Sequence, residues 1–160
     1  MAADIYQYLK SKNISFVEHK HPAFFSVAEG EKYEHMFSFM HTKSLFLKDN
    51  KSNFYLVTLD AHKRLNVRFL REHTKSKKLE FASPAELLEH LNVLPGSVSL
   101  FSSINDSSVK VFIDSSILKS KSAGFHPNIN TSTLELNSDS ILKFIDSISN
   151  SKEVIDLNNA

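Results

Sequence analysis

Three polar islands interrupt apolar segments of this chain, and each holds residue types that could act on a substrate. Lys43 opens the hydrophobic run "LFL", where its ammonium group could stabilise a negative charge. Asn105 and Asp106 offer an amide and a carboxylate in a polar loop. The stretch "AGFHPNINT", residues 123–131, gathers a glycine, a proline, a histidine and two asparagines. Taken singly, each island also has a structural explanation: edge lysines keep strands soluble, Asn–Asp favours turns and Gly-x-x-Pro favours a bend.

The motifs of several common enzyme classes are missing from the sequence. It has no glycine-rich phosphate loop, no His-x-x-x-His pair and no nucleophile elbow. It has no cysteine, which excludes disulfides, thiolate nucleophiles and thiolate metal sites. His19 and His21 share one face if they lie on a strand, but two imidazoles are a weak metal signal. We therefore expect neither a metal nor a cofactor.

The composition is that of one globular domain. A chain of 160 residues with 41% hydrophobic and 23% charged side chains can bury a core of its own. No apolar run approaches the ~20 residues that cross a bilayer, and the N-terminus lacks the pattern of a secretory signal. We expect a cytoplasmic protein without membrane contact.

A net charge of +1 conceals a basic strip, defined here as residues 63–78. The strip holds seven lysines and arginines and one acid, Glu72, whereas residues 132–160 hold five acids and two lysines. Such a strip could attract phosphates. A solvated loop and helix face explains the same pattern equally well.

The elements that must position the polar islands are a mixture of strands and helices. Alternating or β-branched patterns predict strands at 14–19, 43–49, 53–60, 96–101, 109–114 and 131–136. The second and third of these form a hairpin across residues 50–52. Short hairpin connections beside longer crossings indicate an α/β class with a mixed sheet.

Helix-start signals are equally distinct. Helical spacing predicts a helix at 4–12, and Asn66 could cap a short one. Ser83 with Glu86 forms a capping box, and Ser26 with Glu29 forms a second. The last helix should begin after Ser138 and bury one apolar face, made of Ile141, Leu142, Ile145 and Ile148.

Together the islands carry a resemblance that none of them carries alone. The segments "HPAFFSVAEG", "HTKSLFLKD", "LEFASPAELLEHLNVLPGSVSLFSSIND", "KVFID" and "GFHPNINTSTLEL" follow the order and spacing of the YbaK/prolyl-tRNA-synthetase-associated editing-domain family. The resemblance spans residues 5–148 and looks closest to the freestanding ProX group. It implies an editing domain over residues 1–150, followed by a peripheral tail at 151–160.

The family implies a mixed α/β fold with a mainly antiparallel, partly barrel-like sheet and flanking helices. It implies hydrolysis of the ester between a wrong amino acid and the terminal ribose of tRNA, in particular alanine on proline tRNA. No cofactor is implied. The partners would be the acceptor end of an aminoacyl-tRNA and prolyl-tRNA synthetase.

Lys43 matches the family's essential lysine. The Gly-x-x-Pro loop, which backs the aminoacyl pocket in the family, matches Gly124 to Pro127, with His126 facing the substrate. Further substrate contacts are expected from Phe25, Ser44, Lys48, Asn105, Asp106, Phe125 and Asn130. Contacts to the tRNA backbone are expected from Arg68, Arg71 and Lys75 in the basic strip.

Ester hydrolysis fits this inventory of residues. It needs no protein nucleophile if water or the adjacent ribose hydroxyl attacks, but it needs a stabilised oxyanion. Lys43 would supply a cation to the carbonyl oxygen or the terminal phosphate, or transfer a proton if burial lowers its pKa. Lys48 is five residues further on and should point to the opposite face of a straight strand.

Two alternatives stay open. The ProX group usually has Pro–Phe–Gly–Leu where this chain has Leu100, Phe101, Ser102 and Ser103. This difference bears on the shape of the loop and on the amino acid accepted, so a deacylase for Cys-tRNA or another small amino acid is one alternative. A non-catalytic module that binds tRNA or a synthetase is the other, although Lys43 and His126 disfavour it.

Overall fold

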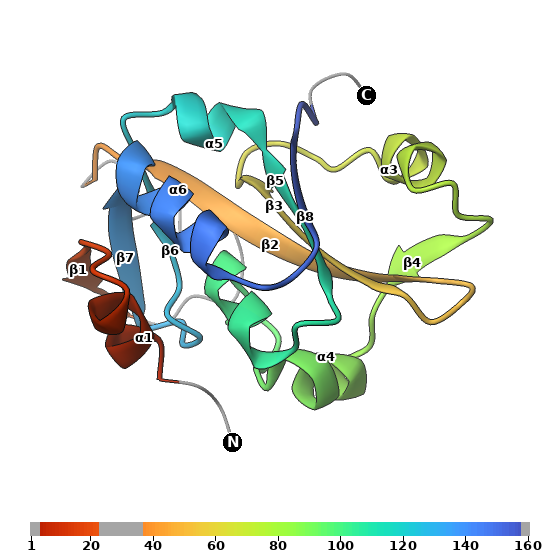
Figure 1. Ribbon diagram of the computed structural model, residues 1–160, viewed down its shortest axis with the longest axis horizontal. Helices are drawn as coiled ribbons and strands as arrows, with labels where there is room; N and C mark the ends of the chain where they lie inside the picture. Colours follow the sequence, from red (N-terminus) through yellow and green to blue (C-terminus); the bar gives the residue numbers. More distant parts are fainter. Residues whose placement is uncertain (1–3, 23–36, 158–160) are drawn as a thin grey trace.

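The longest strand, β2, runs through the middle of the molecule and pairs with three other strands (Figure 1). The computed structural model describes residues 4–22 and 37–157. Its strands are β1 (Val17–Lys20), β2 (Met40–Asp49), β3 (Phe54–Asp60), β4 (Leu79–Phe81), β5 (Lys110–Asp114), β6 (Ser122–Phe125), β7 (Ser132–Asn137) and β8 (Lys152–Ile155). The predicted hairpin is confirmed, because β2 and β3 pair antiparallel from Thr42↔Asp60 to Lys48↔Phe54.

The sheet is mixed, as predicted. Its order is β1-β7-β6-β2-β3-β5-β8, with β4 paired to β2 beside this path. Within the described residues, three pairings are parallel: β2 with β6, β3 with β5, and β5 with β8. The other pairings are antiparallel. The order ends at β1 and β8 without a pairing between them in this part of the chain. The expected barrel-like closure is therefore not confirmed.

Helices flank the sheet at four predicted places and at two that the sequence did not predict. The helices are α1 (Ile5–Ser11), α3 (Val67–His73), α4 (Pro84–Leu91), α5 (Ser115–Lys119), α6 (Ser138–Ser147) and the 3-10 helix η1 (Leu100–Asn105). The two that were not predicted are α5 and η1. Asn66 caps α3, and Ser83 with Glu86 forms the predicted capping box of α4. The second predicted box, at Ser26 and Glu29, lies outside the described residues.

The strand predicted at 96–101 is wrong. The chain instead enters η1 at Leu100, and the Ser99 hydroxyl accepts a hydrogen bond from the Phe101 amide at 3.1 Å. The Ser102 hydroxyl in turn accepts from the Ser99 amide at 3.1 Å. Serines that satisfy nearby amides locally favour a helical start over a strand ladder. The alternating apolar pattern was overridden by this capping.

The buried face of α6 also differs from the predicted one in one residue. Leu142 is 43% exposed, whereas Phe144 is fully buried. The apolar stripe therefore runs through Ile141, Phe144, Ile145 and Ile148, at the spacing of one helix face. The end of the chain, expected to be peripheral, contributes β8 at the sheet edge, where it pairs in parallel with β5.

Three apolar clusters divide the interior. The first packs α1 and α6 against β6 and β7, and includes Leu9, Phe125 and Phe144. The second lies beneath α3 and includes Leu47 and Leu70; the third lies beneath α4. Figure 1 shows α1 and α6 at one end of the molecule and α3 with β4 at the other. Among the described residues, no helix is long and apolar enough to cross a bilayer.

Candidate functional site

Lys43 lies on one face of β2, together with His41 and Leu45. Side chains alternate along a strand, so residues two apart share a face. Leu45 and Lys43 line the same pocket, and the ring of His41 packs against Phe39 with centroids 4.9 Å apart. Since β6 pairs with the start of β2 through His41↔Gly124, this face continues from Lys43 onto Gly124. The tertiary fold thus brings the lysine and the Gly-x-x-Pro loop onto one surface of the sheet.

Aromatic and imidazole rings cover this surface next to Lys43. We call them the imidazole–phenyl cluster, which consists of His19, His21, Phe37, Phe39, His41 and His126. Ring centroids of adjacent members lie 4.9–6.3 Å apart, from the Phe39–His41 pair to the Phe37–His41 pair. The cluster therefore forms a largely apolar wall with nitrogen atoms at defined positions.

Gly124 is required by the packing of this cluster. A Cβ on residue 124 would lie 2.4 Å from Cε1 of Phe39 and 2.7 Å from Cγ2 of Thr133. Both contacts are far shorter than carbon atoms tolerate. The Thr42 hydroxyl also donates to the Gly124 carbonyl at 2.6 Å. Phe39 and Thr133 thus occupy the space beside Gly124, which is not open to a ligand.

The loop that follows Gly124 is held from both sides. Nδ1 of His126 donates to the Ser132 carbonyl at 3.0 Å, and the His21 amide donates to the Thr131 carbonyl at 3.0 Å. The Ser102 hydroxyl donates to Oδ1 of Asn128 at 2.8 Å, which joins η1 to the loop. The predicted bend is therefore a fixed connection from β6 to β7.

Burial lowers the pKa of His126, and the neighbouring His21 and His41 lower it further, whereas the hydrogen bond to Ser132 raises it. The imidazole is therefore neutral at physiological pH, with its proton on Nδ1. A neutral ring does not repel the ammonium group of an amino acid.

Burial also lowers the pKa of Lys43, and the charge of Asp60 partly opposes the shift. Lys43 is opposite Leu59 in the hairpin, one residue from Asp60. A lysine with a lowered pKa loses its proton more readily than an ordinary lysine. The site can thus offer either electrostatic stabilisation or proton transfer.

On the side away from the imidazole–phenyl cluster, Lys43 borders a pocket of about 770 Å³. The pocket is lined by β2, by β4 and by the segment that leads into α3. It includes the first residues of the basic strip, Lys63 and Arg64. Lys43 therefore lies between an aromatic surface and a basic one.

Two of the predicted substrate contacts on β2 face away from Lys43. The hydroxyl of Ser44 is 2.7 Å from Oγ1 of Thr58, which is buried. Nζ of Lys48 makes an ion pair with Glu86 of α4 at 2.9 Å. Both residues sit at even positions of β2, opposite the odd positions that carry Lys43. Ser44 therefore links β2 to β3, and Lys48 links β2 to α4.

Asn105 and Asp106 also have structural partners. Nδ2 of Asn105 donates to the Leu91 carbonyl at 2.9 Å, at the end of α4. Asp106 receives Nδ1 of His90 at 2.8 Å and the Ser108 hydroxyl at 2.6 Å. These bonds attach η1 to α4 and to the start of β5.

The remaining predicted contacts lie in or near the loop after β6. Phe125 points into the core, where it packs against Phe101 with ring centroids 5.5 Å apart. Pro127 is buried in the loop and Asn130 is half-buried there. Phe25 lies outside the described residues.

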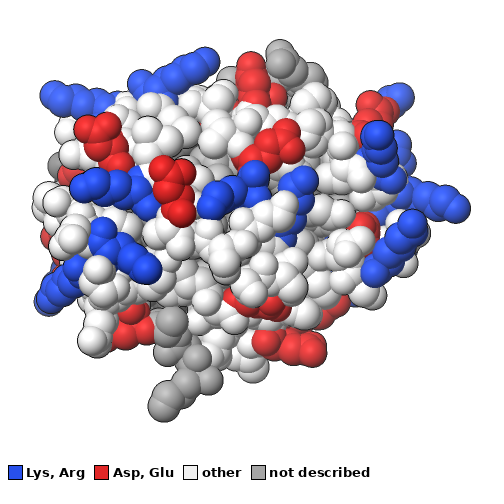
Figure 2. All heavy atoms as spheres, viewed as in Figure 1, with Lys and Arg blue, Asp and Glu red and all other residues white. Residues whose placement is uncertain are grey.

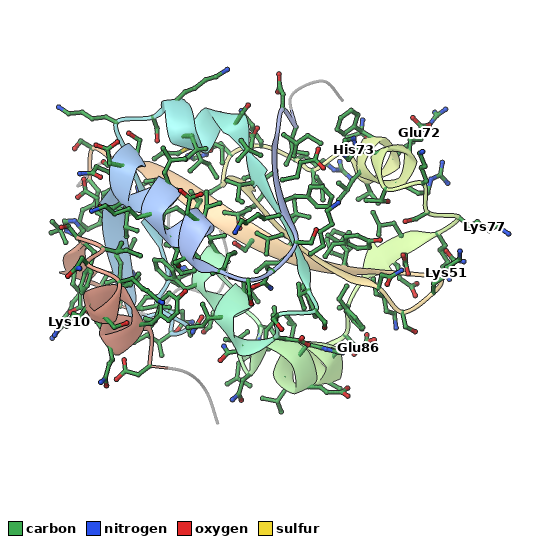
Figure 3. The ribbon with its side chains drawn as sticks, viewed as in Figure 1. Lys10, Lys51, Glu72, His73, Lys77 and Glu86 are labelled. Atoms are coloured by element: carbon green, nitrogen blue, oxygen red, sulfur yellow. The ribbon has the colours of Figure 1, made fainter. Side chains whose placement is uncertain are left out.

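The basic strip lies on and around α3. Arg68 pairs with Glu72 one turn later at 3.2 Å, Arg71 lies in the last turn, and Lys75 follows the helix. Figure 2 shows basic side chains, with acids between them, at the end that carries α3 and β4. In Figure 3, Lys77 projects from this same end. Most basic side chains of the strip are exposed, and its first residues line the pocket beside Lys43.

His19 and His21 are both hydrogen-bonded to β7. Nε2 of His19 is 2.9 Å from Oε1 of Glu135, and Nε2 of His21 is 2.8 Å from Oγ1 of Thr133. In the described residues, no three histidine, aspartate or glutamate side chains gather in a way that could hold a metal ion.

Sequence reasoning missed Phe39 and His41 as site residues. Their signal is their spacing: they precede Lys43 by four and two residues and therefore share its face in a strand. The contact of Phe39 with Gly124 could not be read from the sequence, because it joins residues 85 positions apart across two strands.

Comparisons with known proteins identify the family of this chain. The family model described as "Aminoacyl-tRNA editing domain" matches residues 21–144. The chain is 29% identical over 152 residues to "Prolyl-tRNA editing protein ProX" of Acetoanaerobium sticklandii, covering 93% of each chain. It is 33% identical over 134 residues to "Prolyl-tRNA synthetase associated domain-containing protein 1" of Mus musculus, covering 79% of this chain and 78% of the relative.

Solved structures share the fold. A candidate trans-editing enzyme for prolyl-tRNA synthetase superposes with a TM-score of 0.75 at 15% identity, covering 98% of each chain. The hypothetical protein APE2540 superposes with a TM-score of 0.78 at 17% identity, covering 95% of this chain and 99% of that one. With Lys43 and the Gly124–Pro127 loop on one sheet face and the family model spanning most of its length, this chain belongs to the aminoacyl-tRNA editing domain family.

Proposed function

We propose that this protein is a trans-acting deacylase that hydrolyses the ester of alanine mischarged onto proline tRNA. The observation that carries the proposal is the position of Lys43, a half-buried lysine on the sheet face that leads to Gly124 and His126. Family membership supports an editing reaction, and the name of the ProX relative supports prolyl-tRNA as the target.

In this proposal Lys43 is the catalytic residue. Its ammonium group stabilises the oxyanion that develops when water or the adjacent ribose hydroxyl attacks the ester carbonyl. Partial burial strengthens this interaction, because the local dielectric constant is lower than in bulk water. Asp60 keeps the lysine protonated more often than burial alone would allow.

The imidazole–phenyl cluster forms the aminoacyl side of the site. Phe39 fills the space beside Gly124 and packs against His41, and in this proposal the closely packed rings exclude a pyrrolidine ring more strongly than a methyl side chain. Neutral His126 orients the amino group without repelling it. An apolar wall distinguishes ligands that differ by one methylene by about 1–3 kcal/mol, and a second hydrolytic site adds its own selection to that of the synthetase.

The basic strip forms the tRNA side. Arg68, Arg71 and Lys75 contact backbone phosphates, and the acceptor end crosses from α3 towards Lys43. Prolyl-tRNA synthetase is the partner that would supply the mischarged tRNA. Since tRNA is charged in the cytoplasm, we place the protein there.

Deacylation of a panel of charged tRNAs tests the function. Purified protein is incubated with Ala-tRNA(Pro), Cys-tRNA(Pro), Pro-tRNA(Pro) and Ala-tRNA(Ala), and the remaining ester is measured with time. We expect fast loss of alanine from proline tRNA and little loss of proline. Faster hydrolysis of Cys-tRNA(Pro) than of Ala-tRNA(Pro) would mean that the enzyme prefers a small amino acid other than alanine. Protection of every ester, with tRNA still bound, would make the protein a binding module.

A further inference from the structure

The pocket beside Lys43 combines two kinds of lining that serve different parts of one ligand. Lys43, Lys63 and Arg64 supply positive charge, whereas Leu45, Val67 and Phe81 supply apolar surface. No acid lines the pocket among the described residues. Its volume of about 770 Å³ falls in the range of sites that hold a small organic ligand.

The cations of the pocket differ in how strongly they are already paired. Nζ of Lys63 lies 3.4 Å from Oδ2 of Asp114, whose side chain is fully buried, so its charge is largely matched. Arg64 is exposed and makes no ion pair with another described residue. Arg64 is therefore the group best placed to bind an incoming anion, and a guanidinium suits the paired oxygens of a phosphate.

The apolar wall includes an aromatic ring that the fold leaves open. Phe81 ends β4 opposite Leu47, lines the pocket and is 58% exposed. An exposed phenyl ring beside cations is the arrangement with which proteins stack a nucleobase while holding its phosphate.

We propose that this pocket binds the 3′-terminal nucleoside of tRNA, with the base on Phe81 and its 5′ phosphate on Arg64. The ribose that carries the ester then lies between them and Lys43. This inference rests on the proposed function and adds the subsite that presents the ester to the lysine. It assigns the first part of the basic strip to one nucleotide and the part on α3 to the rest of the acceptor end.

Binding of adenosine 5′-monophosphate to the purified protein tests the subsite without any ester hydrolysis. Chemical-shift titration is performed with this nucleotide, with ribose 5-phosphate and with inorganic phosphate. We expect the nucleotide to bind most tightly. Phe81→Ala should weaken it about tenfold and reduce it to the level of ribose 5-phosphate. Phe81→Trp should retain it, which separates loss of stacking from loss of structure.

Matched variants control for surface and charge. Arg64→Ala should weaken the nucleotide and ribose 5-phosphate alike, whereas Lys10→Ala, at the opposite end of the molecule in Figure 3, should change neither. Leu94→Ala removes another exposed apolar side chain, 66% exposed, and should also leave binding unchanged. Equal nucleotide binding in Phe81→Ala, Arg64→Ala and the parent would overturn the subsite.

The two proposals fail in different ways. If the nucleotide binds at Phe81 but no charged tRNA is hydrolysed, the subsite stands and the deacylase is refuted. If Lys43-dependent deacylation proceeds with an unchanged KM in Phe81→Ala and Arg64→Ala, the deacylase stands and the subsite is refuted. Absence of nucleotide binding at millimolar concentration also refutes the subsite.

Discussion

The two flanks of Lys43 have opposite physical character. On one side the imidazole–phenyl cluster is packed so closely that Phe39 fills the space beside Gly124. On the other side the pocket of about 770 Å³ is open and lined by cations. Closely packed apolar walls discriminate by shape, whereas open charged surfaces attract by long-range electrostatics. In the proposed function, this strand face separates the choice of the amino acid from the capture of the nucleic acid, with Lys43 between them.

Removing Lys43 should affect both flanks and have the largest effect. Lys43→Ala should slow deacylation on the order of a hundredfold or more, because the oxyanion loses its cation. Single-turnover kinetics on Ala-tRNA(Pro), with circular dichroism of the variant, measure this change. Lys51→Ala, at the exposed hairpin tip, is the control (Figure 3). A folded Lys43→Ala variant within a few-fold of the parent rate would remove the lysine from the mechanism.

A larger residue at position 124 should disrupt the packing of the imidazole–phenyl cluster and leave the pocket on the other side of Lys43 unchanged. Gly124→Val places a branched side chain where Phe39 and Thr133 lie, and should cost about 1–3 kcal/mol of unfolding free energy. Urea denaturation measures this cost. Gly124→Ala should be rescued in part by Phe39→Leu, and a double-mutant cycle gives the coupling. Additive effects in that cycle would mean that the two residues do not compete for space.

Neutralising part of the basic strip should weaken the open flank alone. The triple variant of Arg68, Arg71 and Lys75 to alanine should bind uncharged tRNA more weakly. The slope of log affinity against log salt should fall by roughly 1 for each phosphate that the variant no longer neutralises. Selectivity between Ala-tRNA(Pro) and Pro-tRNA(Pro) should not change. An unchanged salt slope would make the strip a solvated helix face.

The smallest expected change concerns the protonation of Lys43. Asp60 raises the pKa of Lys43 against the effect of burial, so Asp60→Asn should lower that pKa further. Asparagine can still accept the amide hydrogen bond from His62. If Lys43 acts as a cation, the rate falls as pH rises through its pKa. In Asp60→Asn this fall should then occur at lower pH than in the parent. If Lys43 accepts a proton, the rate rises through the same pKa instead.

Measuring the pH profile of the parent and Asp60→Asn therefore sharpens the role of the lysine. The background rate of ester hydrolysis by hydroxide is subtracted at each pH. A profile that does not move in Asp60→Asn would show that Lys43 does not titrate in the step measured.

Elements with local signals were predicted well. The capping box of Ser83 and Glu86, the Asn66 cap and the hairpin of residues 43–60 involve neighbours in the sequence, so their patterns suffice. The error at 96–101 arose where two local signals conflicted. Alternating apolar residues indicated a strand. The hydroxyls of Ser99 and Ser102 instead accept hydrogen bonds from backbone amides at the start of η1, which favours the 3-10 helix.

By itself, the sequence determined the residue types of the site and the family. Lys43, the Gly124–Pro127 loop and the basic strip can be named from their order along the chain. The tertiary structure decided which of them meet. The parallel pairing of β2 with β6 places Gly124 beside His41, while Ser44 and Lys48 turn to the other face of the same strand. Strand pairing and face depend on long-range packing, which no local pattern specifies.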